Sequence, residues 1–338
     1  MKHALAQWLA AATGAGKVTV EHLALLGGGA IQENWALDIV GHGGELDGRH
    51  ALVLRTDALS HVPVSWSRTQ EYRILQAAHA AGVIVPEPVA LCEDVTVIGK
   101  LFYLMRRMPG EARGHKLVRD PMVRANGEAL VAQVAAEMAK LHRLQPPLPA
   151  LGFVPLPDRP PALWRIAEYR RHLDAMQATE CVLEWALAWL ERHAPPRERI
   201  CLVHGDLRTG NFLVDRGGLS AILDWEFAAF SDPLEDLGWM LARYWRFGAY
   251  ALEAGGIGTR AALLDGYAAA SGRPVDRAAV AYWEVMATVR WAVIALMQAA
   301  RHFDGRESSL ELALTAHVLP VLELDLLTRI QEIEERGA

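Results

Sequence analysis

The chain has 338 residues, of which 52% are hydrophobic, and its formal net charge is −6. It is long enough for one large domain or two modest ones, and its acidic balance argues against a nucleic-acid partner held by bulk positive charge. Its three cysteines, Cys92, Cys181 and Cys201, are far apart and odd in number. This usage fits a reducing compartment such as the cytosol better than a disulfide framework or a zinc site.

Two apolar stretches raise the question of a membrane. Residues 1–16 predict an amphipathic helix ending at Gly14 in preference to a signal peptide, because the apolar run is short and is broken by Gln7. The most apolar later stretch, 278–300, contains Glu284 and Arg290 and therefore predicts a buried helix, not a membrane span. We expect no membrane association.

The first third of the chain predicts a small β-rich lobe. A three-stranded antiparallel meander is expected over 23–56, with a glycine-rich first turn at Gly27, Gly28 and Gly29. Such a turn lets backbone N–H groups approach phosphate oxygens, although most glycine-rich hairpins bind nothing. A helix follows over 65–81, capped by Ser65 or Ser67, and further strands are expected at 89–93 and 95–104. The next segment, 105–110 (MRRMPG), breaks the pattern as a linker does.

The remainder is mostly helical. Helices are expected over 122–144, 163–176, 179–193, 233–247, 259–271, 276–303 and 308–335. They are interrupted by short strands at 201–203, 212–214 and 221–223. The predicted fold class is therefore α+β, with a five-stranded N-lobe carrying one main helix (1–104), a hinge (105–110) and a larger, mostly helical C-lobe (111–338).

A polar loop between the short strands carries the chemistry. Asp206, Asn211 and Asp224 fall at loop or strand ends, and two carboxylates with an amide oxygen suit a hard cation such as Mg²⁺. The spacing H-G-D-x4-N-x12-D is that of a kinase catalytic loop, in which a base and a metal-binding Asn share one turn and the second metal ligand lies one hairpin later. A simple Asx turn would explain one of these residues but not the set. A metal-dependent hydrolase using His204 and Asp206 would need further ligands and leaves the glycine turn unexplained.

The segments HGDLRTGNFLVD and ILDWE, followed by SDPLEDLGWM, resemble the aminoglycoside phosphotransferase family of small-molecule kinases, related to choline kinases. The resemblance covers nearly the whole chain and implies a bilobal protein-kinase-like fold. It implies that Asp206 is the general base for a substrate hydroxyl, and that Asn211 and Asp224 bind Mg²⁺ bridging the phosphates of ATP.

The same resemblance assigns supporting roles. The hinge would hold the adenine, and the glycine turn (Gly27, Gly28, Gly29) would cover the phosphates. His204 would brace the loop backbone, and Asp236 would hold the loop by hydrogen bonds. Trp225 and Glu226 either face the acceptor or are buried. The hinge residues are Met105, Arg106 and Met108.

One position departs from the family pattern. The third strand should end in a lysine that contacts the phosphates, but ALVLRTD places Arg55 there, which we expect to pair with Glu71. A branch of the family resembling domains fused to acyl-CoA dehydrogenases also has VLR at this point. Because the lysine is missing, a nucleotide-binding pseudokinase that regulates another protein is a rival to an active kinase.

The acceptor is the least determined part. Polycationic aminoglycosides call for a carboxylate-rich site, whereas the helices expected on the acceptor side have mixed charge and the segment after the hinge is basic. This favours a neutral or anionic hydroxyl compound, for example a hydroxyacyl compound, over an aminoglycoside or amino alcohol. The choice between ATP and GTP and the oligomeric state stay open. The basic residues after the hinge are Arg113, His115, Lys116 and Arg119. The charged residues expected on the acceptor side are Arg290, Arg301, His302, Asp304, Arg306, Glu307 and Glu311.

Overall fold

The computed structural model describes residues 1–337 except 28–31, 58–64, 197–198 and 306. The chain forms two compact units, of which the first consists of Met1–Gly110, Pro149–Phe153 and Ser220–Phe227. The second consists of Glu111–Leu148, Val154–Leu219 and Ala228–Ala338. This division differs from the contiguous lobes expected from the sequence, because two later segments pack with the first unit.

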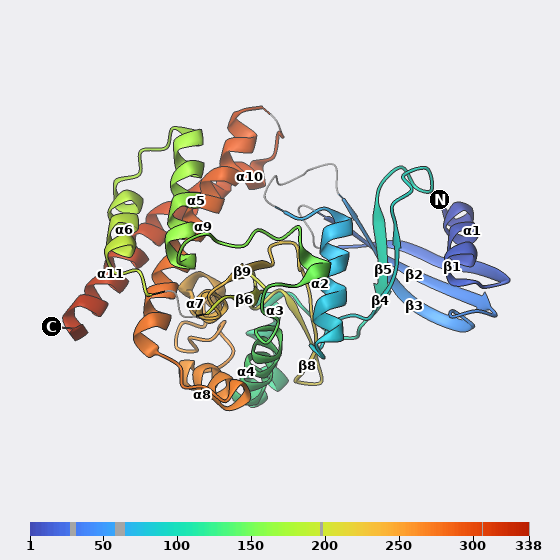
Figure 1. Cartoon of the computed structure of the whole chain (residues 1–338), viewed down its shortest axis with the longest axis horizontal. Coiled ribbons are helices and arrows are strands. Elements are labelled where there is room, and N and C mark those ends of the chain that lie inside the picture. The colour runs from blue at the N-terminus through green and yellow to red at the C-terminus, as the bar shows by residue number, and fades with distance from the viewer. Residues whose placement is uncertain (28–31, 58–64, 197–198, 306, 338) are drawn as a thin grey trace. The chain divides into compact units, whose positions relative to one another are not determined.

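The first unit is built on a five-stranded antiparallel sheet in the order β1-β2-β3-β5-β4 (Figure 1). The meander predicted over 23–56 is confirmed. In its register Leu37 lies opposite both Leu23 and Leu52, so apolar side chains of three adjacent strands share one face. The strands are β1 (Lys17–Leu26), β2 (Gln32–His42), β3 (Gly48–Asp57), β4 (Pro88–Cys92) and β5 (Phe102–Arg106).

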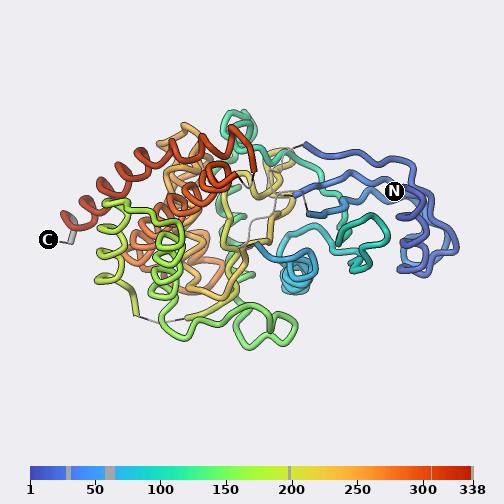
Figure 2. The backbone as a smooth tube through the Cα atoms, turned by 90° about the horizontal axis from the view of Figure 1, so that it is seen from above, coloured from blue at the N-terminus to red at the C-terminus, as the bar shows by residue number. Residues whose placement is uncertain are grey.

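Helix α1 (Lys2–Thr13) belongs to this unit and lies beside β1 in Figures 1 and 2. It ends at Gly14, whose φ of 64° is the left-handed conformation that glycine adopts easily, as the sequence predicted. Leu5 and Leu9 are fully buried in the core that Leu37 and Phe102 also join. The amphipathic pattern of the first helix is therefore explained by packing on the sheet.

Helix α2 (Arg68–Ala80) begins with a reciprocal cap. The Ser67 side chain accepts a hydrogen bond from the Gln70 backbone N–H, and the Gln70 side chain accepts one from the Ser67 backbone N–H. Tyr72 packs on Tyr103 of β5, with ring centroids 5.5 Å apart. Because neighbours along a strand point to opposite faces, Tyr103 lies on the face away from Phe102 and α1. The two helices thus use opposite faces of the sheet.

Strand β5 is displaced from its expected position. The expected strand over 95–104 begins only at Phe102, because 95–101 form turns in which Asp94 accepts hydrogen bonds from the Thr96 N–H (2.8 Å) and hydroxyl (2.7 Å). At its other end β5 runs two residues into the predicted linker, since Met105 and Arg106 pair with β3. The linker interpretation is therefore wrong for these two residues.

The second unit is mainly helical, and one of its cores is formed by α5, α6, α9 and α11. The seven predicted helices are present, but two are interrupted. The helix expected over 233–247 is interrupted at Ala242, where the extended backbone (ψ 132°) ends α7. The helix expected over 308–335 is interrupted by the 3₁₀ turn η3, which separates α10 from α11. Pro320 lies in the first turn of α11, where its missing N–H is tolerated. The helical elements are α3 (Gly114–Leu117), α4 (Pro121–Leu141), α5 (Pro161–Met176), α6 (Cys181–Arg192), α7 (Leu234–Leu241), η2 (Arg243–Arg246), α8 (Arg260–Ser271), α9 (Arg277–Phe303), α10 (Leu310–Thr315), η3 (Ala316–Val318) and α11 (Leu319–Gly337), with η1 (Pro149–Leu151) assigned to the first unit.

Helix α9 is long and apolar enough to cross a membrane by length and composition alone. In the structure 72% of its most apolar window is buried, and it packs against α5, α6, α7 and α11. This is the environment of a core helix, as the sequence indicated.

The polar loop lies between short strands. Strand β6 (Cys201–Val203) pairs antiparallel with β9 (Ala229–Ser231), a strand that the sequence did not predict. Strands β7 (Phe212–Asp215) and β8 (Gly218–Ile222) form a separate two-stranded sheet. The pairing with β9 therefore fixes the position of β6, the strand after which the polar loop begins.

Candidate active site

In the second unit, the loop after β6 is held by one buried carboxylate. Asp236 is fully buried and accepts hydrogen bonds from the backbone N–H groups of His204 (2.8 Å) and Gly205 (2.9 Å). His142 places its Nε2 3.1 Å from the same side chain. Burial alone would raise the pKa of Asp236, but the hydrogen bonds and the neighbouring imidazoles outweigh it and the pKa is lowered. An ionised Asp236 therefore fixes the backbone of the loop.

The same loop brings Asp206 and Asn211 together. Asn211 donates from Nδ2 to Asp206 Oδ2 (2.5 Å) and to the Asp206 backbone carbonyl (2.8 Å). The Trp239 indole N–H donates to Asp206 Oδ1 (2.8 Å), and His204 Nδ1 lies 3.2 Å from the Asp206 backbone N. Asn211 Oδ1 accepts no hydrogen bond from the part of the chain that the structure describes. A carboxylate with a fixed orientation thus lies beside an amide oxygen free to bind a cation.

Two arginines contact the loop, and one of them contacts this carboxylate. Arg208 Nε lies 3.3 Å from Asp206 Oδ1, and its guanidinium lies 4.3 Å from the centroid of the Trp245 ring. Arg290 of α9 lies 4.6 Å from the Trp239 ring and donates to the Gly205 carbonyl. The loop therefore has two arginines stacked on indoles, of which Arg208 contacts Asp206 and Arg290 lies 3.5 Å from Glu235.

Sequence reasoning assigned no role at the loop to Trp239 or Arg208, and placed Arg290 only among the charges of the acceptor side. A signal was present for Trp239, because it follows Asp236 by three residues and so lies on the same side of α7. Arg208 follows Asp206 by two residues in the loop itself.

In the first unit, Arg55 forms the centre of a buried ionic cluster. Its guanidinium contacts Glu71 (Nε to Oε2 3.1 Å, Nη2 to Oε1 3.0 Å) and Asp224 (Nη2 to Oδ1 2.7 Å), while only 4% of Arg55 is exposed. Burial would lower the Arg55 pKa, but the two carboxylates outweigh it and raise the pKa well above its ordinary value. The expected pair of Arg55 with Glu71 is present, and Asp224 is its second partner.

Asp224 follows β8 and has φ 62°, a conformation that non-glycine residues seldom adopt. Its side chain is about one-third exposed, unlike those of Arg55 and Glu71. A carboxylate held in an unfavourable backbone conformation and partly open to solvent is characteristic of a binding residue.

Trp225 and Glu226 are both nearly fully buried in the first unit. Gln32 donates to Glu226 Oε2 (2.6 Å), and the Trp66 N–H donates to the Glu226 carbonyl (3.0 Å). Burial raises the pKa of Glu226 to about 7, against the opposing charge of Arg55. Such burial leaves little of either side chain for an acceptor to contact, because both are tied to the sheet unit.

The other residues predicted to bind the nucleotide do not form one cluster in the part of the chain that the structure describes. Gly27 follows the end of β1, whereas Gly28 and Gly29 lie outside the described residues. Met105 is buried within β5, Arg106 contacts Glu87 (3.3 Å), and Met108 is half-buried in the segment after the strand.

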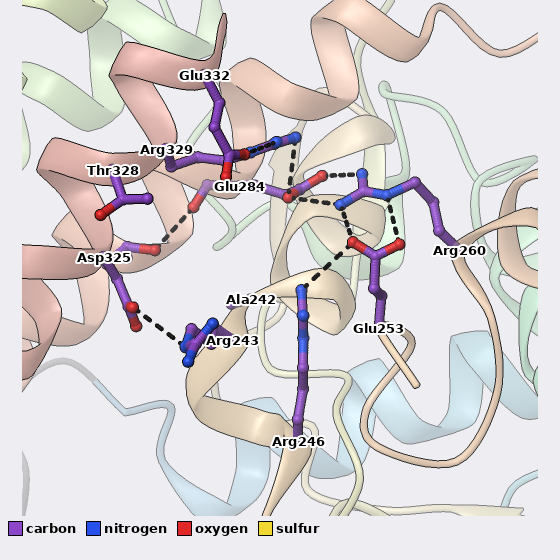
Figure 3. Close-up of a pocket in the computed structure, with 11 residues that line it drawn as sticks. Ala242, Arg243, Arg246, Glu253, Arg260, Glu284, Asp325, Thr328, Arg329 and Glu332 are labelled. Atoms are coloured by element: carbon purple, nitrogen blue, oxygen red, sulfur yellow. Dashed lines mark hydrogen bonds and ion pairs between the residues drawn. The ribbon is translucent and has the colours of Figure 1, made fainter. Parts of the chain in front are cut away.

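A separate pocket in the second unit, of about 150 Å³, contains charges of both signs (Figure 3). Arg260 binds Glu253 (2.9 Å) and Glu284, and Arg329 lies 3.3 Å from Glu284. These side chains neutralise one another and connect α8, α9 and α11. The pocket is therefore lined by a partly buried ionic network that connects these helices.

No group of three or more His, Cys, Asp or Glu side chains suited to a metal ion occurs among the described residues. The oxygen donors that could serve a hard cation are instead Asn211 Oδ1 in the second unit and the Asp224 carboxylate in the first. Amide and carboxylate oxygens are the ligands that Mg²⁺ prefers, so the donor types fit this ion.

A five-stranded sheet unit with α2 against its face, followed by a helical unit carrying the loop H-G-D-x4-N, defines a protein-kinase-like fold. The fold class predicted from the sequence is confirmed. The chain matches the model of the phosphotransferase enzyme family over residues 22–283 and belongs to that family. The family description places it among the phosphotransferases.

Curated relatives are similar to this chain over part of their own length. Acyl-CoA dehydrogenase family member 11 of Gallus gallus is 33% identical over 184 residues, which cover 52% of this chain and 23% of that protein. The chain spans between 17% and 37% of the length of the curated relatives it matches.

Two solved structures show the same fold. A candidate aminoglycoside phosphotransferase from Ralstonia eutropha JMP134 superposes with a TM-score of 0.75 at 22% identity, covering 98% of both chains. Spectinomycin phosphotransferase, solved in complex with ADP and spectinomycin, has a TM-score of 0.63 at 11% identity, covering 98% of this chain and 99% of its own.

Proposed function

We propose that the protein transfers the γ-phosphate of ATP, with Mg²⁺, to a hydroxyl group of a small neutral or anionic molecule. The observation that carries this proposal is the Asp206 carboxylate, whose two oxygens are oriented by Trp239 (2.8 Å) and Asn211 (2.5 Å) in a loop fixed by Asp236. An oriented carboxylate is what a general base for a hydroxyl proton requires.

In the proposed step, the acceptor oxygen forms a bond to the γ-phosphorus, and the bond between that phosphorus and the β,γ-bridging oxygen breaks. ADP leaves with the electron pair, and the acceptor proton passes to Asp206 Oδ1 or Oδ2. Asn211 and Asp224 are the proposed ligands of Mg²⁺, which when bound would neutralise phosphate charge. His204 and Asp236 support the loop; their backbone contacts favour structural roles.

The first unit supplies the proposed nucleotide side. Arg55, held by Glu71, places a permanent cation beside Asp224, as contact with phosphate oxygens requires. We assign adenine contact to the backbone of 105–108, with Gly27, Gly28 and Gly29 covering the phosphates. ATP is favoured by the ADP complex of the spectinomycin enzyme, and GTP stays the alternative nucleotide. We place the reaction in the cytosol, in keeping with three free cysteines.

A second candidate is phosphorylation of an aminoglycoside or amino alcohol, because solved relatives include spectinomycin phosphotransferase and a choline/ethanolamine kinase family protein. The curated relatives, named for acyl-CoA dehydrogenases, favour hydroxyacyl compounds as the first acceptors to test. The two candidate acceptor classes can be distinguished with a panel of hydroxyacyl compounds, amino alcohols and aminoglycosides. Phosphorylation of each compound is followed by product mass and ADP release. Product formation also separates a kinase from a regulatory pseudokinase.

Asp206→Asn tests the proposed base. We expect turnover to fall by about 10² to 10⁴, the contribution of general-base catalysis, while Mg-ATP binding measured by calorimetry stays within about threefold. Asp215→Asn is a matched control, because it removes the same charge at the exposed end of the adjoining strand β7. Wild-type turnover in a folded Asp206→Asn variant would show that the base is misassigned.

A further inference from the structure

Arg208 is a charged side chain that contacts the proposed base and keeps an unused donor. Its Nε lies 3.3 Å from Asp206 Oδ1 and its Nη1 lies 3.4 Å from the Thr209 carbonyl, while its Nη2 donates to none of the residues that the structure describes. About one-quarter of the side chain is exposed. Arg208 can therefore keep its contact with Asp206 and bind a further anionic group.

The position of this guanidinium is fixed by the surrounding residues. It lies 4.3 Å from the centroid of the Trp245 ring, and the ring is itself buried. A Cβ added at Gly210 would lie 2.7 Å from Arg208 Nη1, so a side chain at that position would displace the guanidinium. Gly210 also has φ 118°, which favours glycine.

The aromatic platform, which we define as Tyr244, Trp245 and Trp291, extends from the guanidinium. Trp245 lies 5.0 Å from Tyr244 and 4.9 Å from Trp291 between ring centroids. Tyr244 is 39% exposed and Trp291 is partly buried. Because Trp245 is 4% exposed, Tyr244 and Trp291 provide the apolar surface that this platform offers.

We infer that Arg208 determines the charge of the acceptor, binding the carboxylate of a hydroxy acid whose apolar body lies on the aromatic platform. This inference rests on the proposed function and narrows its substrate class from neutral or anionic compounds to anionic ones. An arginine with a free N–H donor recognises a carboxylate by charge and by hydrogen bonding together.

The same arrangement disfavours a cationic acceptor. Aromatic faces attract ammonium groups, but Arg208 covers a face of Trp245 and Arg290 covers a face of Trp239. An ammonium group beside Asp206 would in addition meet the positive charge of Arg208. Amino alcohols and aminoglycosides should therefore be poorer acceptors than hydroxy acids of equal size.

The test uses three matched series: hydroxyalkanoates of about three to eight carbons, their primary amides, and amino alcohols of the same length. Each is assayed for phosphorylation, and for thermal stabilisation of the protein bound to Mg²⁺ and a non-hydrolysable ATP analogue. The variants are Arg208→Gln, Arg208→Lys and the control Arg277→Gln, which removes one charge from an exposed arginine paired with Asp265.

For the wild type and Arg277→Gln we expect acids to be preferred over amides, and amides over amines. Arg208→Gln should raise KM for the acids about ten- to a hundredfold more than KM for the amides, while any loss of kcat that arises through Asp206 is common to both series; Arg208→Lys should fall between. In the thermal assay the stabilisation by acids should be lost in Arg208→Gln alone.

The inference is overturned if Arg208→Gln changes kcat and KM for acids and amides by the same factors, since Arg208 would then act only through Asp206. It is also overturned if the wild type prefers amines, or if no acid stabilises it more than it stabilises Arg208→Gln. Preferred phosphorylation of amines would leave the kinase activity standing and favour the second candidate acceptor class. ATP hydrolysis without transfer to any acceptor class would count against that function itself.

Discussion

Asp236 is the residue on which the geometry of the loop depends most directly. Its two oxygens accept hydrogen bonds from two successive backbone N–H groups, His204 and Gly205, and it is fully buried. Backbone donors cannot be replaced by side-chain rearrangement, so removing the acceptor leaves buried N–H groups without partners. The orientation of Asp206, two residues further on, depends on this contact.

Asp236→Asn should lower the free energy of unfolding by about 2–4 kcal/mol at neutral pH, because an amide has one acceptor oxygen and no charge. Since the native pKa of Asp236 is lowered, the contribution of the ionised carboxylate is complete above its ordinary pKa of about 4 and is lost as pH falls through the native value. Urea unfolding from pH 3 to pH 7 should therefore show the two proteins converging below pH 4. A difference that stays constant down to pH 3 would contradict this account.

The site residues differ in how far they could be predicted from sequence. Asp206 and Asn211 share one loop, so their spacing alone indicated that they lie together. In the structure Asn211 Nδ2 lies 2.5 Å from Asp206 Oδ2. Trp239 and Arg290 reach the same loop from α7 and α9. Contacts of this kind depend on how helices pack, which a local pattern does not encode.

At the scale of elements, the close packing of α7 on α9 depends on a glycine. A Cβ added at Gly238 would lie 2.5 Å from the Trp283 backbone carbon and 2.7 Å from the Trp283 Cβ. Only a residue without a side chain allows this approach, and both the loop support from Asp236 and the indole of Trp239 are carried by the same helix.

Gly238→Ala should destabilise the protein by about 2–3 kcal/mol, because the backbone of α9 cannot yield as a flexible side chain would. Gly266→Ala in α8 is the matched control. There the nearest atom, the Ala132 Cα, would lie 3.1 Å from the new Cβ, and a smaller change of about 1 kcal/mol or less is expected. Thermal unfolding of both variants provides the comparison, and equal losses would argue against a specific contact between α7 and α9.

The elements themselves were largely predictable, and the errors have local causes. Helices with strong apolar periodicity, such as α4 and α9, are present with ends close to those expected. The late start of β5 arises from the Asp94–Thr96 turn, and the end of α7 at Ala242 arises from one extended residue. Strand β9 is three residues long and was not foreseen, because its pairing partner, β6, lies 28 residues earlier in the chain.

At the scale of the whole molecule, the two units do not follow the order of the sequence. Segment Ser220–Phe227 joins the first unit although it follows β7 of the second. Its attachment comes from Asp224 bonding Arg55 at 2.7 Å and from Glu226 bonding Gln32 at 2.6 Å. These two pairs are separated by nearly 170 and by 194 residues along the chain, and hydrophobic periodicity does not reveal contacts at such separations. The sequence analysis therefore predicted two contiguous lobes and did not assign 220–227 to the first unit.

The second unit is joined across its helices by the network around Glu284, which is only 5% exposed. Its carboxylate is bound by Arg260 of α8 (Nη2 to Oε2 3.0 Å) and by Arg329 of α11 (Nη2 to Oε2 3.3 Å), as Figure 3 shows. Neutralising it would leave two partly buried guanidinium groups with less compensating charge, a change that is far more destabilising in a protein interior than at the surface.

Glu284→Gln should therefore lower the free energy of unfolding by about 2–4 kcal/mol and increase hydrogen exchange in α11, which loses one of its links to α9. Glu332→Gln is the matched control, since Glu332 binds the same arginine at 2.9 Å but is 46% exposed. A surface pair of that kind contributes about 0–1 kcal/mol. Urea unfolding and hydrogen exchange by mass spectrometry should separate the two variants. If both shift stability equally and α11 keeps its protection in Glu284→Gln, the network is not what joins the C-terminal helix to the core.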